Sequence, residues 1–303
     1  MRNGRALVTF VAAGFALAVR AEEVPYVRQK PEGPLQCGLL GEASGLASSP
    51  TDGSFFWLVN DSGSPAELHL ASTDGSDLGK VSLREARNTD WEDLCSFVSE
   101  GKPYLLIADC GDNAGQRPEC LLHVVAEPRL PEAGKQLEGD VQAAWTIRFR
   151  YEDGPRDCES VAVDEEAGKI LLLSKRTEPP LLYELPLKPA SDAIQTARKI
   201  GAISKPLPPG FPPIPYGSQP TGMSLCPDGS AAAVVTYAGT FLFPRKEGES
   251  WAAAFSREPL ALERHLLRQA ESVAFSRDGG VLRVVSEGGK SPVACYRRAG
   301  KEK

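Results

Sequence analysis

The chain has 303 residues, of which 42% are hydrophobic and 24% are charged. This is the composition of an ordinary globular protein, and it excludes a disordered or collagen-like chain. The formal charge is −6 at pH 7 and no run of Lys or Arg occurs, so the sequence argues against nucleic acid as a partner.

The first 21 residues have the pattern of a signal peptide. Arg2 and Arg5 precede an apolar stretch over residues 6–19, and Ala21 is a small residue at a suitable cleavage position. A membrane anchor is the alternative, but the stretch is shorter than the roughly 20 residues that span a bilayer. We therefore predict an exported protein, periplasmic or extracellular, with a signal peptide over residues 1–21, a single domain over residues 22–303 and no membrane span after cleavage.

Seven cysteines are compatible with an oxidising compartment, and their odd number leaves at least one unpaired in a monomer, the oligomeric state that we expect. Cys110 and Cys120 enclose a short polar loop and are the first disulfide that we predict. Cys37 and Cys295 lie near the two ends of the mature chain and would pair if those ends meet.

One unit recurs five times along the chain: a polar or acidic residue, a short strand, a turn with Gly, and an apolar strand that ends in polar residues. The units are residues 42–46 with 56–61, 92–94 with 105–109, 159–163 with 170–175, 221–225 with 233–237, and 271–275 with 282–287. Further strands are expected over residues 121–126 and 145–151. The units start 50 to 67 residues apart, which suits four-stranded blades, so we predict an all-β propeller rather than a β-sandwich.

The last unit is followed by too few residues for two more strands. We expect residues 24–40 to supply the missing outer strand, so that the two chain ends pair and close the ring. Five blades are visible, and a degenerate sixth is conceivable within residues 187–218. A cluster of prolines over residues 206–220 excludes a helix or central strand there, which leaves a connector or a rim over the channel.

The start of each first strand lies beside the end of the second, because the two run antiparallel. One rim of the ring should therefore collect both sets of polar residues. These are Glu42, Glu92, Glu159, Thr221 and Glu271 at the starts and Asp61, Asp109, Lys175, Tyr237 and Glu287 at the ends. Carboxylates crowded in this way repel one another unless a cation balances them, and Ca²⁺ prefers oxygen ligands. Alternatively, each Glu accepts backbone hydrogen bonds and only sets the spacing of the blades.

The second unit carries the most distinctive motifs: residues 88–94, residues 109–113 with Arg117, and residues 126–128. Together with residues 42–46 and 60–63, they resemble exported bacterial propellers of the TolB-like six-bladed group, near the phytase-like esterase domains. The resemblance implies six blades, and carboxylates in the channel mouth that hold calcium for hydrolysis. The matching positions here are Glu42, Asp61, Glu92, Asp93, Asp109, Asp112, Asn113, Glu159 and Glu271.

The candidate substrate-binding residues are Trp91, Lys175, Arg176, Tyr237 and Arg117. Trp91 either packs in the core, as we expect for Trp57 and Trp145, or lies at the rim, where it would stack on a sugar ring or cap the site. The basic residues are few for a phosphate substrate, whose charge must be neutralised in the transition state. Two classes of function therefore stay open. One is a binding propeller that takes a small molecule or a protein at an acidic, calcium-holding mouth. The other is a calcium-dependent hydrolase of a phosphoester, ester or lactone.

Overall fold

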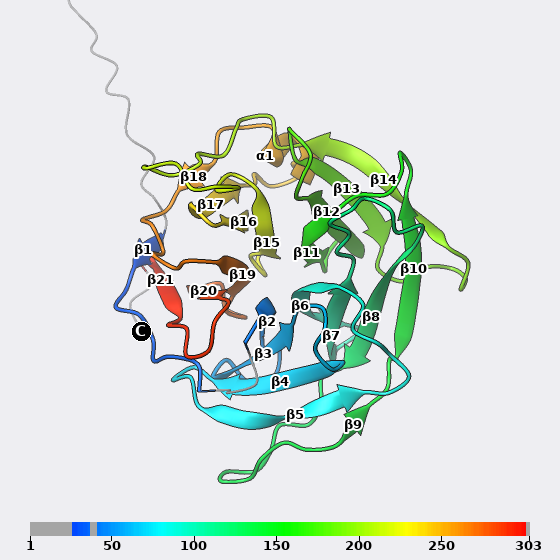
Figure 1. Ribbon diagram of the computed structural model, residues 1–303, viewed down its shortest axis with the longest axis vertical. Helices are drawn as coiled ribbons and strands as arrows, with labels where there is room; N and C mark the ends of the chain where they lie inside the picture. Colours follow the sequence, from blue (N-terminus) through cyan, green and yellow to red (C-terminus); the bar gives the residue numbers. More distant parts are fainter. Residues whose placement is uncertain (1–25, 37–40, 301–303) are drawn as a thin grey trace, which may run out of the picture.

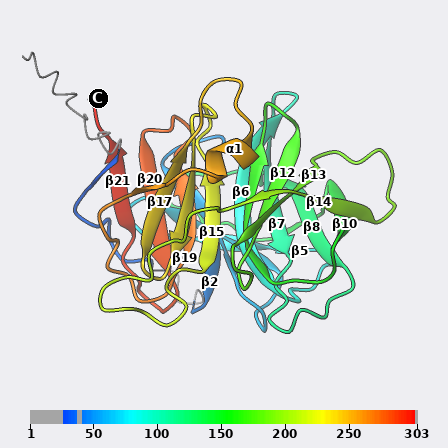
Figure 2. The ribbon, with the colours of Figure 1, turned by 90° about the horizontal axis from the view of Figure 1, so that it is seen from above.

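A computed structural model describes residues 26–36 and 41–300, and these form a five-bladed β-propeller. The predicted signal peptide and Cys37 lie outside the described residues. Figure 1 shows the blades arranged in a ring around a central axis, with the first strand of each blade nearest to it, and Figure 2 shows the ring from the side. Within the described part of the chain no helix is long and apolar enough to cross a membrane.

Each blade is a four-stranded antiparallel sheet whose first strand is innermost, except that the last blade takes its outermost strand from the N-terminal end of the described chain. From the inside outwards, the first blade consists of β2 (Ala43–Ser48), β3 (Phe55–Asn60), β4 (Glu67–Ser72) and β5 (Asp77–Leu83), and the second of β6 (Trp91–Ser99), β7 (Lys102–Asp109), β8 (Cys120–Ala126) and β10 (Trp145–Tyr151). The third blade consists of β11 (Cys158–Asp164), β12 (Lys169–Ser174), β13 (Leu181–Pro186) and β14 (Gln195–Ala202), and the fourth of β15 (Pro220–Leu225), β16 (Ala231–Thr236), β17 (Gly239–Pro244) and β18 (Leu260–Ala261). The fifth blade consists of β19 (Ala270–Phe275), β20 (Val281–Ser286), β21 (Ala294–Arg298) and β1 (Tyr26–Arg28). The short strand β9 (Asp140–Val141) pairs in parallel with β5, and α1 (Trp251–Phe255) lies between β17 and β18. The predicted strands over residues 121–126 and 145–151 are confirmed as β8 and β10.

The predicted closure of the ring is confirmed. β1 pairs antiparallel with β21, so that Tyr26 lies opposite Arg298. The inner strands contact one another all the way round, and β19 meets β2 at the closure. Five clusters of buried side chains, one at each interface between neighbouring blades, form the core. A positive φ is found, as the sequence predicts, at Gly101, Gly168, Gly229 and Gly279. The glycine of the first hairpin, Gly53, does not adopt one.

Residues 187–218 do not contain a sixth blade. Their strand, β14, is the outer strand of the third blade and also pairs in parallel with β10 of the second. Residues 206–219 of the proline-rich segment contain no strand and connect the third blade to the fourth. The exclusion of a central strand is wrong only at Pro220, the first residue of β15. The implied six blades are therefore not found in the described chain.

The predicted disulfide between Cys110 and Cys120 is also not found. Both are buried free thiols, as is Cys295. The Cys110 thiol donates instead to the backbone carbonyl of Cys158, at 3.2 Å. Cys110 therefore faces the third blade rather than its own loop.

Candidate cation site at the channel mouth

One residue near the start of every inner strand lies outside the regular ladder, because the pairing register shifts there as it does at a β-bulge. Such an extra residue re-aims its side chain. The five residues are Ser44, Glu92, Glu159, Thr221 and Glu271. When the five repeats were aligned with one another, the first was therefore misplaced by two residues, since Ser44 and not Glu42 occupies the bulged position.

The residues that follow the ends of the second strands are Asp61, Cys110, Lys175, Tyr237 and Glu287. They come one residue after the positions that pair with the inner strands. Here the second unit was misaligned by one residue, because Asp109 pairs within the ladder opposite Trp91. Cys110 takes the place in this ring where the other blades present charged or phenolic groups.

Short and long side chains at the bulged position have different roles. The Ser44 hydroxyl donates to the carbonyl of Trp91 at 2.7 Å, and the Thr221 hydroxyl donates to the carbonyl of Ala270 at 2.6 Å. Both bonds tie an inner strand to the next blade. These two hydroxyls, rather than the glutamates, perform the spacing role that the sequence left open for the rim.

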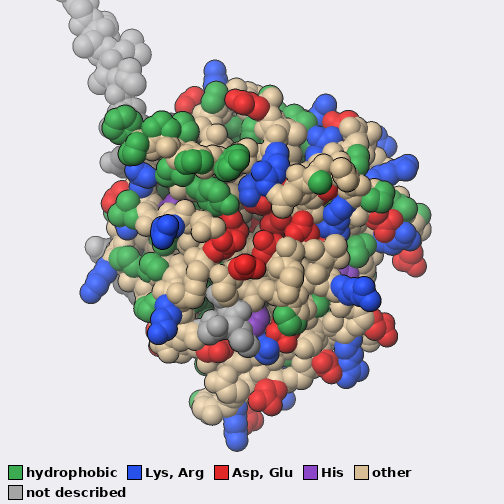
Figure 3. Space-filling model, in the orientation of Figure 1, with side chains coloured by type: hydrophobic (Ala, Val, Ile, Leu, Met, Phe, Trp, Pro, Cys, Tyr) green, Lys and Arg blue, Asp and Glu red, His purple; other side chains and the backbone are tan. Residues whose placement is uncertain are grey.

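The glutamates gather with other acids at the centre of the face in Figure 3. Two groups of three carboxylates each have ligand oxygens within 4.8 Å of one another: Asp61, Asp90 and Glu92, and Glu92, Asp157 and Glu159. Neither Asp157 nor Asp90 was among the candidate site residues from the sequence. Each lies two residues before a bulged Glu, and this repeated offset is the signal that would have identified both.

Glu92 belongs to both groups. Its side chain is 4% exposed, and its carboxylate accepts no hydrogen bond and makes no ion pair within the described residues. Burial raises the pKa of Glu92 well above its usual value, and the neighbouring Glu159 and Asp61 raise it further. Gly111 provides the space for this arrangement, because a Cβ there would lie 2.3 Å from a Glu92 oxygen and 2.5 Å from an Asp90 oxygen.

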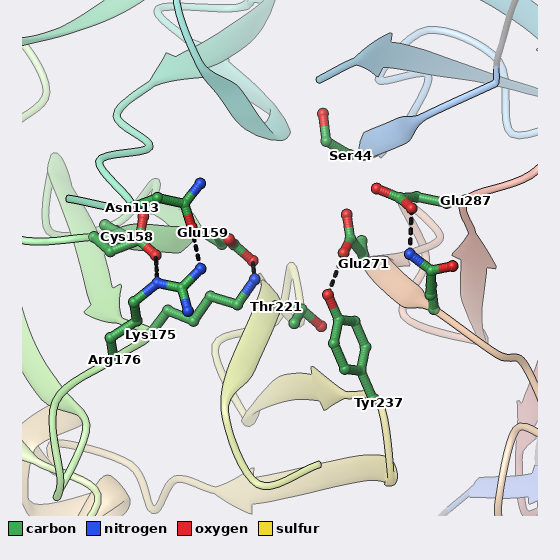
Figure 4. A network of polar contacts seen from close by, with 12 residues as sticks. Ser44, Asn113, Cys158, Glu159, Lys175, Arg176, Thr221, Tyr237, Glu271 and Glu287 are labelled. Atoms are coloured by element: carbon green, nitrogen blue, oxygen red, sulfur yellow. Dashed lines mark hydrogen bonds and ion pairs between the residues drawn. The ribbon is translucent and has the colours of Figure 1, made fainter. Parts of the chain in front are cut away.

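The two groups differ in how their charge is balanced. Lys175 forms an ion pair with Glu159, and Arg176 Nε lies 2.7 Å from Asp157 Oδ2 (Figure 4). No basic side chain in the described chain forms an ion pair with Asp61, Asp90 or Glu92. Burial, together with the charge of Asp61, raises the pKa of Asp90 to about 6. The group of Asp61, Asp90 and Glu92 is therefore the one that lacks a cation.

On the other side of the mouth, carboxylates lie beside uncharged partners. The Tyr237 hydroxyl donates to Glu271 at 2.6 Å, and the Gln269 amide donates to Glu287 at 2.5 Å. Burial and the charge of Glu271 raise the pKa of Glu287 to about 8. Glu42 lies at the exposed edge of the same rim.

Three predicted metal ligands have structural contacts instead. Asp93 is fully buried and accepts hydrogen bonds from the backbone N–H groups of Leu94, Val161 and Met223. Asp109 is fully buried in an ion pair with Arg117, at 2.7 Å. Asp112 accepts from the N–H groups of Gln116 and Arg117 within its own loop. Their carboxylates hold the backbone rather than face the mouth.

The predicted substrate-binding residues are also mostly engaged. Trp91 is fully buried in the core between the first two blades, so its ring cannot stack on a ligand in the mouth. Arg117 is held by Asp109 and by the carbonyl of Gly111, and Arg176 contacts Asn113 as well as Asp157. Lys175 and Tyr237 do line the mouth, where the Lys175 ammonium lies 5.6 Å from the centre of the Tyr237 ring.

The unbalanced acids predict an unusual dependence of stability on pH. A carboxyl whose folded-state pKa is raised contributes stability that is complete below its unfolded pKa and is lost as the pH rises through the folded pKa. For Glu287 this window extends from its ordinary value of 4.5 to about 8. In chelator-treated protein, we expect a melting temperature a few degrees lower at pH 8 than at pH 6, and a smaller difference in Glu287→Gln. Exposed Glu247 provides the control, and an equal pH dependence in Glu247→Gln and Glu287→Gln would contradict this prediction.

No model of a known protein family matches the chain, and no curated protein matches it. Among solved structures, it is similar to the luciferin-regenerating enzyme, at 11% identity over 89% of this chain and 96% of that chain, with a TM-score of 0.48. It is also similar to the WD40 domain of Pan2 from Neurospora crassa, at 10% identity over 86% of this chain and 64% of that chain, with a TM-score of 0.38. A third similar structure is hydrazine synthase from Kuenenia stuttgartiensis, at 10% identity over 81% and 62% of the two chains, with a TM-score of 0.40. The chain thus spans less than two thirds of the Pan2 and hydrazine synthase chains, and identities this low say nothing about activity.

Proposed function

We propose that this protein is an exported β-propeller whose channel mouth binds a calcium ion through Asp61, Asp90 and Glu92. The observation that carries the proposal is the Glu92 carboxylate, which is buried, lacks a partner and lies among other acids. A buried charge without a partner is costly, and a bound cation removes this cost. All the donors in the group are carboxylate oxygens, the ligands that a hard cation prefers, and carbonyl oxygens and water can complete the shell.

The neighbouring contacts hold two of these acids in place. The Asn88 side-chain amide donates to the carbonyls of Asn60 at 2.9 Å and Asp61 at 2.8 Å, which joins the loop before β6 to the end of β3. The side-chain oxygen of Asn88, Oδ1, accepts a hydrogen bond from the backbone N–H of Trp91 at 3.0 Å, so the turn that carries Asp90 is fixed. The group is thus assembled before any ion arrives, which lowers the entropic cost of binding.

Calcium added to chelator-treated protein should raise its thermal stability. An ion that binds only the folded state adds about 2.7 kcal/mol at a concentration of one hundred times its Kd. For a domain of this size, this corresponds to a rise of roughly 5 to 10 °C in the melting temperature, measurable by differential scanning fluorimetry. Glu92→Gln should abolish the rise, although the ion-free variant should melt higher than the ion-free wild type because repulsion is relieved.

Glu42→Gln is the matched control, since Glu42 is an acid of the same rim outside both carboxylate groups. It should retain the calcium-dependent rise. Isothermal titration calorimetry should detect one ion in the wild type. If the wild type showed no rise, or Glu92→Gln showed the same rise, the proposal would fail.

Hydrolysis is the second candidate, and it depends on the same ion acting as a Lewis acid on a bound carbonyl or phosphoryl oxygen. The hydrogen-bonded pair of Tyr237 and Glu271 favours it, because this pair places a phenol and a carboxylate in the same mouth, across from the cation group. Neutral esters or lactones fit better than phosphoesters, since Lys175, Arg176 and Arg117 are each paired with a carboxylate. Greater calcium-dependent turnover of p-nitrophenyl phosphate than of p-nitrophenyl acetate would reverse this order.

Export is the remaining part of the proposal, motivated by the pattern of residues 1–21. Mass spectrometry of the protein from its own secretory host should identify Glu22 as the first residue of the exported form. Recovery of the intact chain beginning with Met1 in the cytoplasm would contradict export without affecting the cation site.

A further inference from the structure

Three large apolar side chains are exposed near the mouth. Phe211 is 88% exposed, Tyr216 is 64% exposed and Leu266 is 68% exposed, and we call these three residues the apolar lip. Tyr216 and Leu266 also have φ values of +58° and +62°, which few residues other than Gly adopt. Such backbone strain is typical of functional segments.

The lip is held against the wall of the mouth at both of its segments. The Arg264 guanidinium donates to the carbonyl of Phe211 at 3.2 Å, which joins the two segments. The His265 ring bonds to the carbonyl of Thr236 at 3.0 Å, and the N–H of Ala238 donates to the carbonyl of Gly217 at 3.3 Å. Both anchors flank Tyr237. In Figure 3 a hydrophobic patch borders the acidic centre of the face.

The part of the mouth next to the lip is acidic, and Lys175, the basic side chain that acts on it electrostatically, forms its ion pair with Glu159 instead. We call Glu42, Glu271 and Glu287 the acidic sector. The backbone joins its two ends, because the N–H of Gly288 donates to the carbonyl of Gly41 at 2.9 Å. None of the three forms an ion pair in the described chain. Elsewhere in the same mouth, Lys175 shows how an ammonium is held, by the Glu159 carboxylate and the face of the Tyr237 ring.

We propose that the apolar lip and the acidic sector together dock an extended segment of a partner protein, which places a Lys or Arg side chain in the mouth and an apolar side chain against Phe211, Tyr216 and Leu266. Charge complementarity favours a basic segment, and exposed aromatic anchors beside a desolvated charge are the usual centre of such an interface. The inference goes beyond the proposed function, because it adds a partner protein to the proposed cation. It uses none of the residues of the proposed calcium group.

A short fluorescein-labelled peptide of alternating Leu and Lys is the probe, with fluorescence anisotropy as the measurement. Peptides of alternating Leu and Glu and of alternating Ser and Lys separate the two parts of the recognition. The wild type should bind the Leu/Lys peptide more tightly than either control, and more weakly as the salt concentration rises past about 0.1 M. The double variant Phe211→Ser with Leu266→Ser should lose about tenfold in affinity, and so should Glu287→Gln.

Ile194→Ser is the matched control, because Ile194 is an exposed apolar residue of the third blade's outer edge, and it should bind as the wild type does. Equal binding by the lip double variant, or by the Leu/Glu peptide, would overturn the proposal. So would self-association of the wild type that the double variant loses, since this would assign the lip to a second copy of the chain. Each titration is repeated with calcium and with chelator. Peptide binding in a protein that calcium does not stabilise would contradict the cation site alone. Stabilisation by calcium in a protein that does not bind the peptide would contradict the docking site alone.

Discussion

A chain that begins at residue 37 is expected to lose its cooperative fold, whereas a chain that begins at residue 24 should melt as the wild type does. The difference between the two is β1 and the segment after it, which supply the outer strand of the last blade. Without β1, the backbone groups of β21 form an exposed strand edge, and such edges aggregate.

The side chains of this segment explain the size of the effect. The Glu32 carboxylate lies 2.7 Å from the guanidinium of Arg283, a residue that is 7% exposed. The loss of Glu32 would therefore leave the buried Arg283 charge without its partner. This alone costs about 3 to 5 kcal/mol. The buried Tyr26 ring and its 2.6 Å hydrogen bond to the carbonyl of Gly279 would be lost as well. The sum is comparable to the whole stability of a domain, about 5 to 15 kcal/mol.

Circular dichroism melting and size-exclusion chromatography of the two chains measure this effect. Glu32→Gln in the full chain isolates the ion pair and should destabilise the fold by less than the truncation does. A chain beginning at residue 37 that stayed monomeric with an unchanged melting temperature would show that the ring does not need its N-terminal strand.

Asp93→Ala should have the second largest effect. The Asp93 carboxylate lies on the second blade and accepts backbone N–H groups from the third and fourth blades, Val161 at 2.8 Å and Met223 at 3.3 Å, in addition to its neighbour Leu94 at 2.8 Å. Removal of the acceptor leaves three buried donors unsatisfied, and each costs about 1 to 3 kcal/mol. We expect a loss of about 3 kcal/mol or more in the free energy of unfolding, measured by urea titration.

Asp93→Asn should cost less than Asp93→Ala. Burial raises the pKa of Asp93 well above its usual value, so the folded protein tolerates an uncharged acceptor there. Asp112→Ala is the control, because the Asp112 carboxylate accepts two N–H groups within a single loop, and the bond from the Asp112 N–H to Asp157 survives the substitution. If Asp93→Ala were no more destabilising than Asp112→Ala, the carboxylate would not hold the blades together.

The rim shows where prediction from the sequence succeeds and where it stops. The convergence of acids on one mouth followed from antiparallel hairpins and needed no coordinates. The alignment of the first two units failed, because a bulge inserts one residue into a strand without changing its apolar pattern. The structure therefore has Ser44 at the position of the repeat where Glu42 was predicted, and Cys110 at the position where Asp109 was predicted. Asp157 was missed for the same reason, since its offset from Glu159 has meaning only once the bulge is known.

A propeller closed by its two chain ends could be predicted from the repeat, the turn glycines and the shortage of strands at the C-terminal end. This was possible because hairpin geometry and strand count are local properties of the sequence. Burial and partners could not be obtained in this way. The sequence left Trp91 open between core and rim, and the structure packs its ring in the core between two blades. Asp93 and Asp109 read as ligands, yet each carboxylate is committed to backbone N–H groups, and Asp109 also to an Arg. Which carboxylate is left with no partner depends on contacts between residues far apart in the chain, such as Asp93 and Met223, 130 positions apart, and only the tertiary structure decides those contacts.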